Sequence, residues 1–220
     1  MRLVIASTIG FGMALVLNAI AAVWLAVKAA LACAGSAVAA SLSGWPAGAA
    51  ALAAVAAVTA IWGLHVFEAA QRPAKTLGVH PTFRFFVRLA YAWLLVAAGL
   101  TMWAVTADTS GGIWGASRHA LTVGFLSTMV FGIGQRVLPA FCGMRVLFSP
   151  ILMLLSLVLV NLGCVLRVSA EIPAYEGYSR GAWSVLPVSA VIEMAAFSLF
   201  AANLMVTLVR RGPHAVTIAS

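Results

Sequence analysis

Charge is scarce in this 220-residue chain: 8% of its residues are charged, only five are acidic, and four are histidines. Its thirteen lysines and arginines sit at the ends of apolar segments and form no basic stripe, which argues against a nucleic-acid partner. At 64% hydrophobic residues, the chain has more apolar surface than a soluble domain of this length can bury. We therefore expect the lipid bilayer to be its solvent.

Several chemistries are also missing. The three cysteines, Cys33, Cys142 and Cys164, show no paired or metal-type spacing, and an odd number cannot form a closed disulfide set. No Walker-type phosphate loop, HExxH, CxxC, CxxCH or nucleophile elbow is present, which argues against a hydrolase and against covalent c-type haem. The apolar run 3–27 is too long for a signal-peptide core, so it predicts an uncleaved first helix.

Six apolar runs are long enough to cross a hydrocarbon core of about 30 Å, which takes about 20 helical residues. Backbone polar groups in lipid must be satisfied within the segment, so runs of this length predict helices and not barrel strands. We expect an all-α polytopic membrane protein, one bundle over residues 1–220. Its six transmembrane helices are placed near 3–27, 47–68, 85–107, 118–138, 149–169 and 184–209.

Basic residues are unequally divided between the two sides of this arrangement. One side carries Arg2, Arg72, Lys75, Arg84, Arg88, Arg136, Arg145, Arg210 and Arg211, and the other carries Lys28, Arg118, Arg167 and Arg180. Cytoplasmic segments are enriched in lysine and arginine, so both termini are expected to be cytoplasmic. The segment 167–180 is expected to be a charged outer loop.

His119 is placed at the outer start of the fourth helix, directly after Arg118. A neutral imidazole is a good ligand for haem iron or copper while its second nitrogen is held by an acceptor. Met102 ends the third helix at a similar depth and would complete a His/Met axial pair. Arg118 and Arg167 lie at the same level as candidate partners for haem propionates. The alternative is an interfacial histidine bonded to water or to a loop carbonyl.

Two further ionisable residues are candidates. His65, near the inner end of the second helix, is either a ligand of a separate inner metal site that His80 would share, or the partner of Glu68 one turn on. Glu193 lies about ten residues into the sixth helix, where an ionised carboxylate is costly. It is a proton-path candidate, or a neutral group bonded across helices to a side chain such as Asn161.

A stripe of small residues runs along the fourth helix at Gly124, Thr128 and Gly132. Such a stripe favours close helix packing. The alternative is a groove against which a flat macrocycle lies.

The run His119-Ala120-Leu121-Thr122-Val123-Gly124, with Thr128-Met129, Arg136 and Leu166-Arg167, resembles the carboxyl-terminal half of the NnrS family over residues 115–210. Those are multi-pass bacterial membrane proteins associated with haem, copper and the response to nitric oxide. The resemblance implies a bacterial inner-membrane protein with His119 as the haem ligand and Arg136 and Arg167 as matching polar positions. Full-length members resemble twelve-helix proteins, whereas this chain supplies six helices. It also lacks the family's His-Ala-His-Glu-type cluster, which argues against copper.

Three functions follow from these observations. The leading prediction is a membrane protein that binds haem b near its outer face and acts in nitric oxide or respiratory redox metabolism. The second is a cofactor-free anchor or accessory subunit of a respiratory complex, in a homodimer or a hetero-oligomer with another membrane subunit. The third is a transporter of protons or small solutes that uses Glu193.

Overall fold

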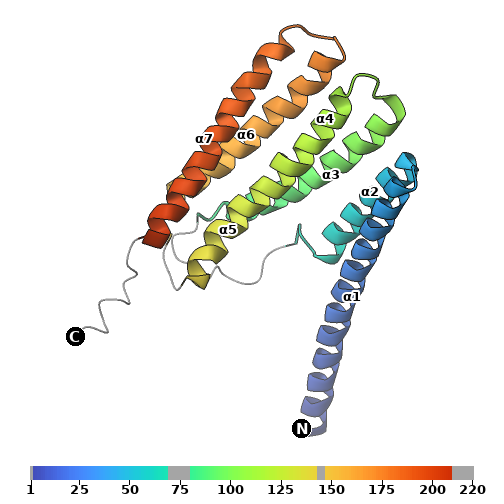
Figure 1. The fold of residues 1–220 in the computed structure, drawn as a ribbon. Helices are drawn as coiled ribbons and strands as arrows, with labels where there is room; N and C mark the ends of the chain where they lie inside the picture. The colour runs from blue at the N-terminus through green and yellow to red at the C-terminus, as the bar shows by residue number, and fades with distance from the viewer. Residues whose placement is uncertain (1, 69–79, 143–146, 210–220) are drawn as a thin grey trace, which may run out of the picture. The chain divides into compact units, whose positions relative to one another are not determined.

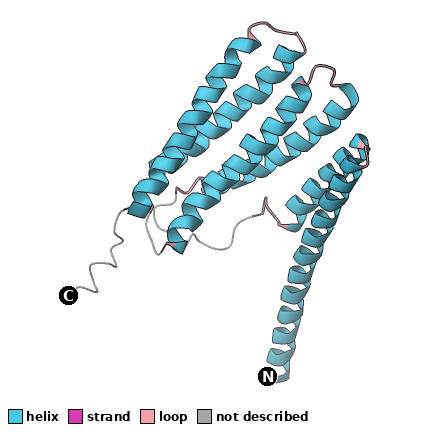
Figure 2. Cartoon of the chain, viewed as in Figure 1, coloured by secondary structure: helices cyan, strands magenta, loops and turns pink. Residues whose placement is uncertain are grey.

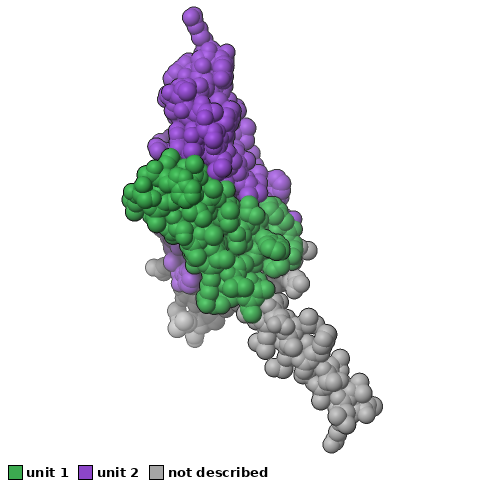
Figure 3. Space-filling model, turned by 90° about the vertical axis from the view of Figure 1, so that its right-hand side faces the viewer, with its two compact units in different colours: residues 1–68 green, residues 69–220 purple. Residues whose placement is uncertain are grey.

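The computed structural model describes residues 2–68, 80–142 and 147–209, without the side chains of residues 2–20 and 140. The described residues form helices joined by short loops, with no strand among them (Figure 2). In the described ranges, six helices are long and apolar enough to cross a membrane, which confirms the predicted fold class. The chain divides into two compact units, residues 1–68 and 69–220, and each is described by itself (Figure 3).

The first unit is a hairpin of α1 (Arg2–Leu42) and α2 (Pro46–Gly63), joined by a tight turn at Gly44 (Figure 1). The two helices approach closely at Gly63, where a Cβ atom would collide with the Cβ of Ala26. Small residues thus bring the two backbones together, as they do in many membrane hairpins.

Both boundaries of this hairpin differ from the prediction. The first helix was expected to end at residue 27, but α1 continues to Leu42, so Lys28 lies within a helix and not in an outer loop. The alanine-rich segment after Lys28 has a high helix propensity and meets no strong breaker before Gly44. The second helix ends at Gly63 and not at 68, because His65 takes a left-handed backbone conformation with φ +50°.

The second unit is a bundle of α3 (Phe83–Ala107), a long three-part span, α6 (Pro150–Tyr175) and α7 (Ala182–Val209). The three-part span runs without interruption through α4 (Gly112–His119), the π-helix η1 (Ala120–Ser127) and α5 (Thr128–Phe141). The α3–α4 and α6–α7 connections lie at the same end of the bundle (Figure 1). Ser110 Oγ donates a hydrogen bond to Glu176 Oε1 across 2.6 Å and links the two connections. We call this end of the bundle, where both connections lie, the hairpin end.

The start of α4 corrects the predicted depth of His119. The carboxylate of Asp108 accepts hydrogen bonds from the backbone N–H groups of Ser110, Gly111 and Trp114, which satisfies donors at a helix start. The helix therefore begins at Gly112 and not at 118. His119 lies seven residues inside it, about 10 Å along the axis, and not at its mouth.

The end of α6 corrects a second prediction. Residues 167–175 were expected in a charged loop, but they form the last two turns of α6. Arg167 and Glu171 are spaced i, i+4, so they neighbour each other on the helix surface, and their charge does not signal a loop. The start of α6 is as predicted: Pro150 is its first residue, and Ser149 Oγ accepts from the N–H of Leu152.

Candidate functional site

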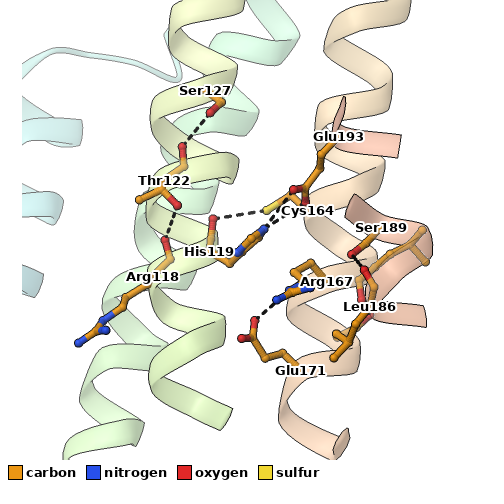
Figure 4. A network of polar contacts seen from close by, with 12 residues as sticks. Arg118, His119, Thr122, Ser127, Cys164, Arg167, Glu171, Leu186, Ser189 and Glu193 are labelled. Atoms are coloured by element: carbon orange, nitrogen blue, oxygen red, sulfur yellow. Dashed lines mark hydrogen bonds and ion pairs between the residues drawn. The ribbon is translucent and has the colours of Figure 1, made fainter. Parts of the chain in front are cut away.

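The side chains of His119 and Glu193 meet inside the second unit. Nε2 of His119 lies 3.1 Å from Oε1 and 3.3 Å from Oε2 of Glu193 (Figure 4). The two side chains expose 25% and 13% of their surfaces. Glu193 lies eleven residues after the start of α7, about 16 Å along its axis. An imidazole and a carboxylate are therefore paired well within two membrane-length helices.

A glycine on α6 makes room for the His119–Glu193 pair. A Cβ atom at Gly163 of α6 would lie 2.5 Å from Cγ of Glu193, so no larger residue fits there without moving the glutamate. On the next residue of α6, Sγ of Cys164 lies 3.8 Å from the backbone oxygen of His119, to which it donates a weak hydrogen bond. The pair is thus held by α4, α6 and α7 together.

The π-helix η1 begins directly after His119. In a regular α-helix, His119 and Thr128 would be about 180° apart around the axis, since each residue turns about 100°. One additional residue in a π-segment reduces this difference to about 80°. The π-helix therefore lets His119 face α7 while Thr128, fully buried, receives a hydrogen bond from Nδ2 of Asn161 on α6.

A second ionisable pair lies on α6, nearer the hairpin end. Nε of Arg167 and Oε2 of Glu171 are 3.5 Å apart, and the side chains expose 26% and 10% of their surfaces. Both atoms are buried and neither makes a hydrogen bond. The carboxylate of Glu171 lies against Gly115 of α4, where a Cβ atom would collide with Oε1. Glu193 and Glu171 are thus each accommodated by a glycine on a neighbouring helix.

The predicted haem partners of His119 lie in different places. Arg167 lies beside the His119–Glu193 pair, but the side chain of Arg118 points away from it and stacks over the Trp114 ring, at 5.9 Å (Figure 4). Met102 exposes 39% of its surface on α3, whereas the imidazole of His119 is directed to α7. Arg136 lies 4.9 Å from the ring of Phe83, which begins α3 at the end opposite the hairpin end.

The small-residue stripe serves helix packing at its first two positions. A Cβ atom at Gly124 would lie 2.6 Å from Cγ of Trp93, so the indole ring of α3 fills the space in which a macrocycle was considered. Trp93 Nε1 donates to Oδ1 of Asn161 across 2.9 Å, and Asn161 Nδ2 in turn bonds Thr128. Asn161 thus bonds this cluster and not Glu193.

The remaining histidines have local partners where they are described. Nδ1 of His65 contacts Oε1 of Glu68, which confirms the pairing considered from the sequence. Nδ1 of His80 lies 2.7 Å from Oγ1 of Thr82. His214, like Arg72, Lys75, Arg145, Arg210 and Arg211, lies outside the described residues. Over the ranges that are described, no three His, Cys, Asp or Glu side chains form a group suited to a metal ion.

Comparison with known proteins assigns the chain to a protein family. A family model described as "Domain of unknown function (DUF8744)" matches residues 3–209, nearly the whole chain. No curated protein and no solved structure matches the chain.

Proposed function

We propose that this chain, which belongs to the DUF8744 family, is a membrane protein that binds and releases protons at the His119–Glu193 pair during proton-coupled transport. The observation that supports the proposal is the contact between an imidazole and a carboxylate inside helices long enough to span a bilayer. Ionisable groups at such depth are costly, and they commonly mark proton relays in pumps and transporters.

The chemistry of the two groups suits this role. Histidine changes its charge between about pH 5 and 8, the physiological range. One proton between the two side chains leaves either a neutral histidine beside a neutral glutamic acid or an ion pair, and neither state carries a net charge. A second proton makes the site cationic, which is costly in lipid. Binding and release of this proton therefore depend on the charged and polar groups around the pair.

Flux in proteoliposomes tests the proposal. A pH gradient is imposed across vesicles that contain a pH-sensitive dye, and the rate of its collapse is compared with protein-free vesicles. We expect wild-type protein to accelerate the collapse and Glu193→Gln to abolish the acceleration. Glu176→Gln is the matched control, because Glu176 lies in the α6–α7 connection and bonds Ser110. Equal flux in wild type and Glu193→Gln would exclude the proposal. An anchoring subunit without transport predicts that result.

A second candidate function is haem b binding in nitric oxide or respiratory redox metabolism. It is favoured by one observation: metal-binding histidines usually have their other ring nitrogen held by an acceptor such as a carboxylate, and Glu193 supplies one here. The resemblance of residues 115–210 to NnrS also supports it. Bound haem would supply electron transfer, and His119 would hold it. Of the other haem contacts predicted from the sequence, Arg167 lies beside His119, whereas Arg118 points away from it and Met102 is exposed on α3.

A spectrum separates the two candidates. A stoichiometric b-type signal in the reduced-minus-oxidised difference, confirmed by a pyridine haemochrome assay and lost in His119→Ala, would support haem. A colourless, folded protein with Glu193-dependent flux would support proton transport alone.

We further infer a location in a bacterial inner membrane, with both termini in the cytoplasm and the hairpin end outside. The unequal division of lysines and arginines along the sequence, nine against four, supports this orientation. The apolar side chains exposed along all six spans support lipid contact. Assembly into a homodimer or with another membrane subunit is proposed on the small-residue faces of α1 and α2.

A further inference from the structure

We propose that Glu171 exchanges protons between the hairpin end and the His119–Glu193 pair, and that Arg167 positions the Glu171 carboxylate for this exchange. The inference rests on the proposed function and adds to it the entry side and the residues of the route.

The first argument is the placement of Glu171 on α4. Its carboxylate lies against Gly115, four residues before His119. Residues four apart share one face of a helix, so Glu171 contacts the His119 face of α4 one turn nearer the hairpin end. Glu171 is also four residues from the end of α6, about 6 Å along the axis. It therefore stands between His119 and the α6–α7 connection.

The second argument is the spacing along α6. Gly163, Arg167 and Glu171 recur every four residues and share one face. Glu193 packs against the first of them, and the third is itself a buried glutamate. Arg167 thus lies between two carboxylates, as Figure 4 shows, and it pairs with Glu171. The Arg167 guanidinium thus pairs with Glu171 and lies between it and the His119–Glu193 pair.

The third argument is the incomplete bonding of the Arg167–Glu171 pair. A buried salt bridge is favourable only when its remaining donors and acceptors are satisfied. Here Oε2 of Glu171 and Nε of Arg167 are both buried without a hydrogen bond. Asp108 at the start of α4, in contrast, accepts three backbone hydrogen bonds. Oε2 therefore has an ion-pair partner but no hydrogen bond, so its lone pairs can still accept an arriving proton.

The transfer conserves protons and charge. The protonated carboxyl of Glu171 gives its proton, directly or through water, to Nδ1 of His119, the ring nitrogen that does not face Glu193. The ring releases the proton on Nε2 to the Glu193 carboxylate that faces it. The imidazole ends neutral, Glu193 is protonated, and the Glu171 carboxylate regains a proton from water at the hairpin end.

The test separates the rate of proton uptake from the affinity of the central pair. Uptake by the reconstituted protein is followed with a pH dye after a rapid pH jump, and the titration of His119 is followed by NMR of ¹⁵N-histidine-labelled protein. We expect Glu171→Gln to slow uptake at least about tenfold and to leave the His119 midpoint unchanged. Arg167→Gln should slow uptake similarly, and Arg167→Lys, which keeps the charge, should restore part of the rate.

A glycine variant guards against loss of folding through the charge change. Gly115→Ala leaves every ionisable group in place but adds a Cβ atom where Oε1 of Glu171 lies, so it should also slow uptake. Gly99→Ala is the matched control, because nothing lies within 4 Å of its Cβ position. Wild-type uptake in both Glu171→Gln and Gly115→Ala, together with loss of flux in Glu193→Gln, would overturn this inference alone. Unchanged flux in Glu193→Gln would overturn the proposed function itself.

Discussion

The two ends of the α3–α7 bundle bury polar groups in opposite ways. Toward the hairpin end the polar side chains that pair inside the bundle are ionisable, in the pairs His119–Glu193 and Arg167–Glu171, beside the buried hydroxyls of Ser117 and Ser189. At the opposite end they are neutral amides and hydroxyls, and we call this set the amide network. Its members are Gln135, Ser149, Ser156, Asn203 and Thr207.

The amide network is richly bonded. Nδ2 of Asn203 donates to Oε1 of Gln135 and to the backbone oxygen of Ser149, and its Oδ1 accepts from the backbone N–H of Ser149. Nε2 of Gln135 donates to Oγ of Ser156 across 3.2 Å. These contacts tie α5, α6 and α7 together, so the network has the properties of a structural crosslink.

The ionisable end differs because its bonding is incomplete. The hydrogen-bond capacity of Arg167 and Glu171 is partly unused, and His119 and Glu193 change their number of bonds with each proton. A neutral, satisfied network stabilises one arrangement, whereas an ionisable, partly satisfied one can change state. The comparison therefore predicts that variants of the amide network affect stability, and variants of the ionisable end affect proton binding.

The largest expected effect is on stability, from Asn203→Ala. The truncation leaves the amide oxygen of Gln135 and the backbone N–H of Ser149 without their partners, while the backbone oxygen of Ser149 keeps the N–H of Met153. We expect the free energy of unfolding in detergent to fall by about 3 kcal/mol, since each unsatisfied buried group costs about 1–3 kcal/mol. Ser198→Ala, which removes one exposed hydroxyl, is the control. Loss of proton flux in a folded Asn203→Ala protein would contradict the prediction that the amide network affects stability and not proton binding.

The next effect concerns the interior between the two ends. Gly124→Ala pushes a Cβ atom into the indole of Trp93, and overpacking of this kind costs about 1–3 kcal/mol. Gly99→Ala, in open space on α3, should be neutral or stabilise by up to about 1 kcal/mol through helix propensity. Thermal unfolding of both variants measures the difference. A stable Gly124→Ala variant would show that the groove beside Gly124 is not filled by Trp93.

The sequence predicted the class and most spans, because hydrophobic length alone determines them. It singled out His119, Glu193 and Arg167 but did not pair the first two. The reason is depth: a helix start at 118 leaves His119 at the membrane surface, whereas the Asp108 bonds to Gly111 and Trp114 move the start to Gly112. Periodicity also cannot reveal the π-helix, whose additional residue rotates every position after His119.

Glu171 was missed as a site residue for a related reason. A cluster of charges after an apolar run usually indicates a loop, so the composition of segment 167–180 favours that interpretation. The useful signal was spacing: Gly163, Arg167 and Glu171 at four-residue intervals, and Gly115 four residues before His119. Glycine recurring with ionisable residues on the same helical face is what makes room for buried carboxylates here.

A double-mutant cycle measures whether the ionisable pair interacts as its geometry indicates. His119→Gln, Glu193→Gln and the double variant are compared with wild type by thermal unfolding in detergent. We expect a coupling free energy of about 2 kcal/mol, typical of a hydrogen bond to a charged group. Additive effects would mean that the two side chains are neighbours without a shared proton. The same cycle on Ser110 and Glu176, which are exposed, should give less than about 1 kcal/mol.

The smallest effect belongs to Asp108, the carboxylate that begins α4 outside the spans. Slight burial raises its pKa, but hydrogen bonds from the backbone N–H groups of Trp114, Gly111, Ser110 and Ile113 together lower the pKa below its ordinary value. Its stabilising contribution is therefore fully present above the pKa of the unfolded chain, about 3.9, and is lost as the pH falls through the lower folded value.

Asp108→Ala should cost about 1 kcal/mol at neutral pH, the usual cost of losing a helix cap, and should flatten the acid limb of the stability curve. Asp108→Asn keeps an acceptor oxygen, so it should retain most of the cap while losing the same pH dependence. If Asp108→Asn destabilised as much as Asp108→Ala, the charge at the start of α4 and not the hydrogen bonds would set the depth of His119.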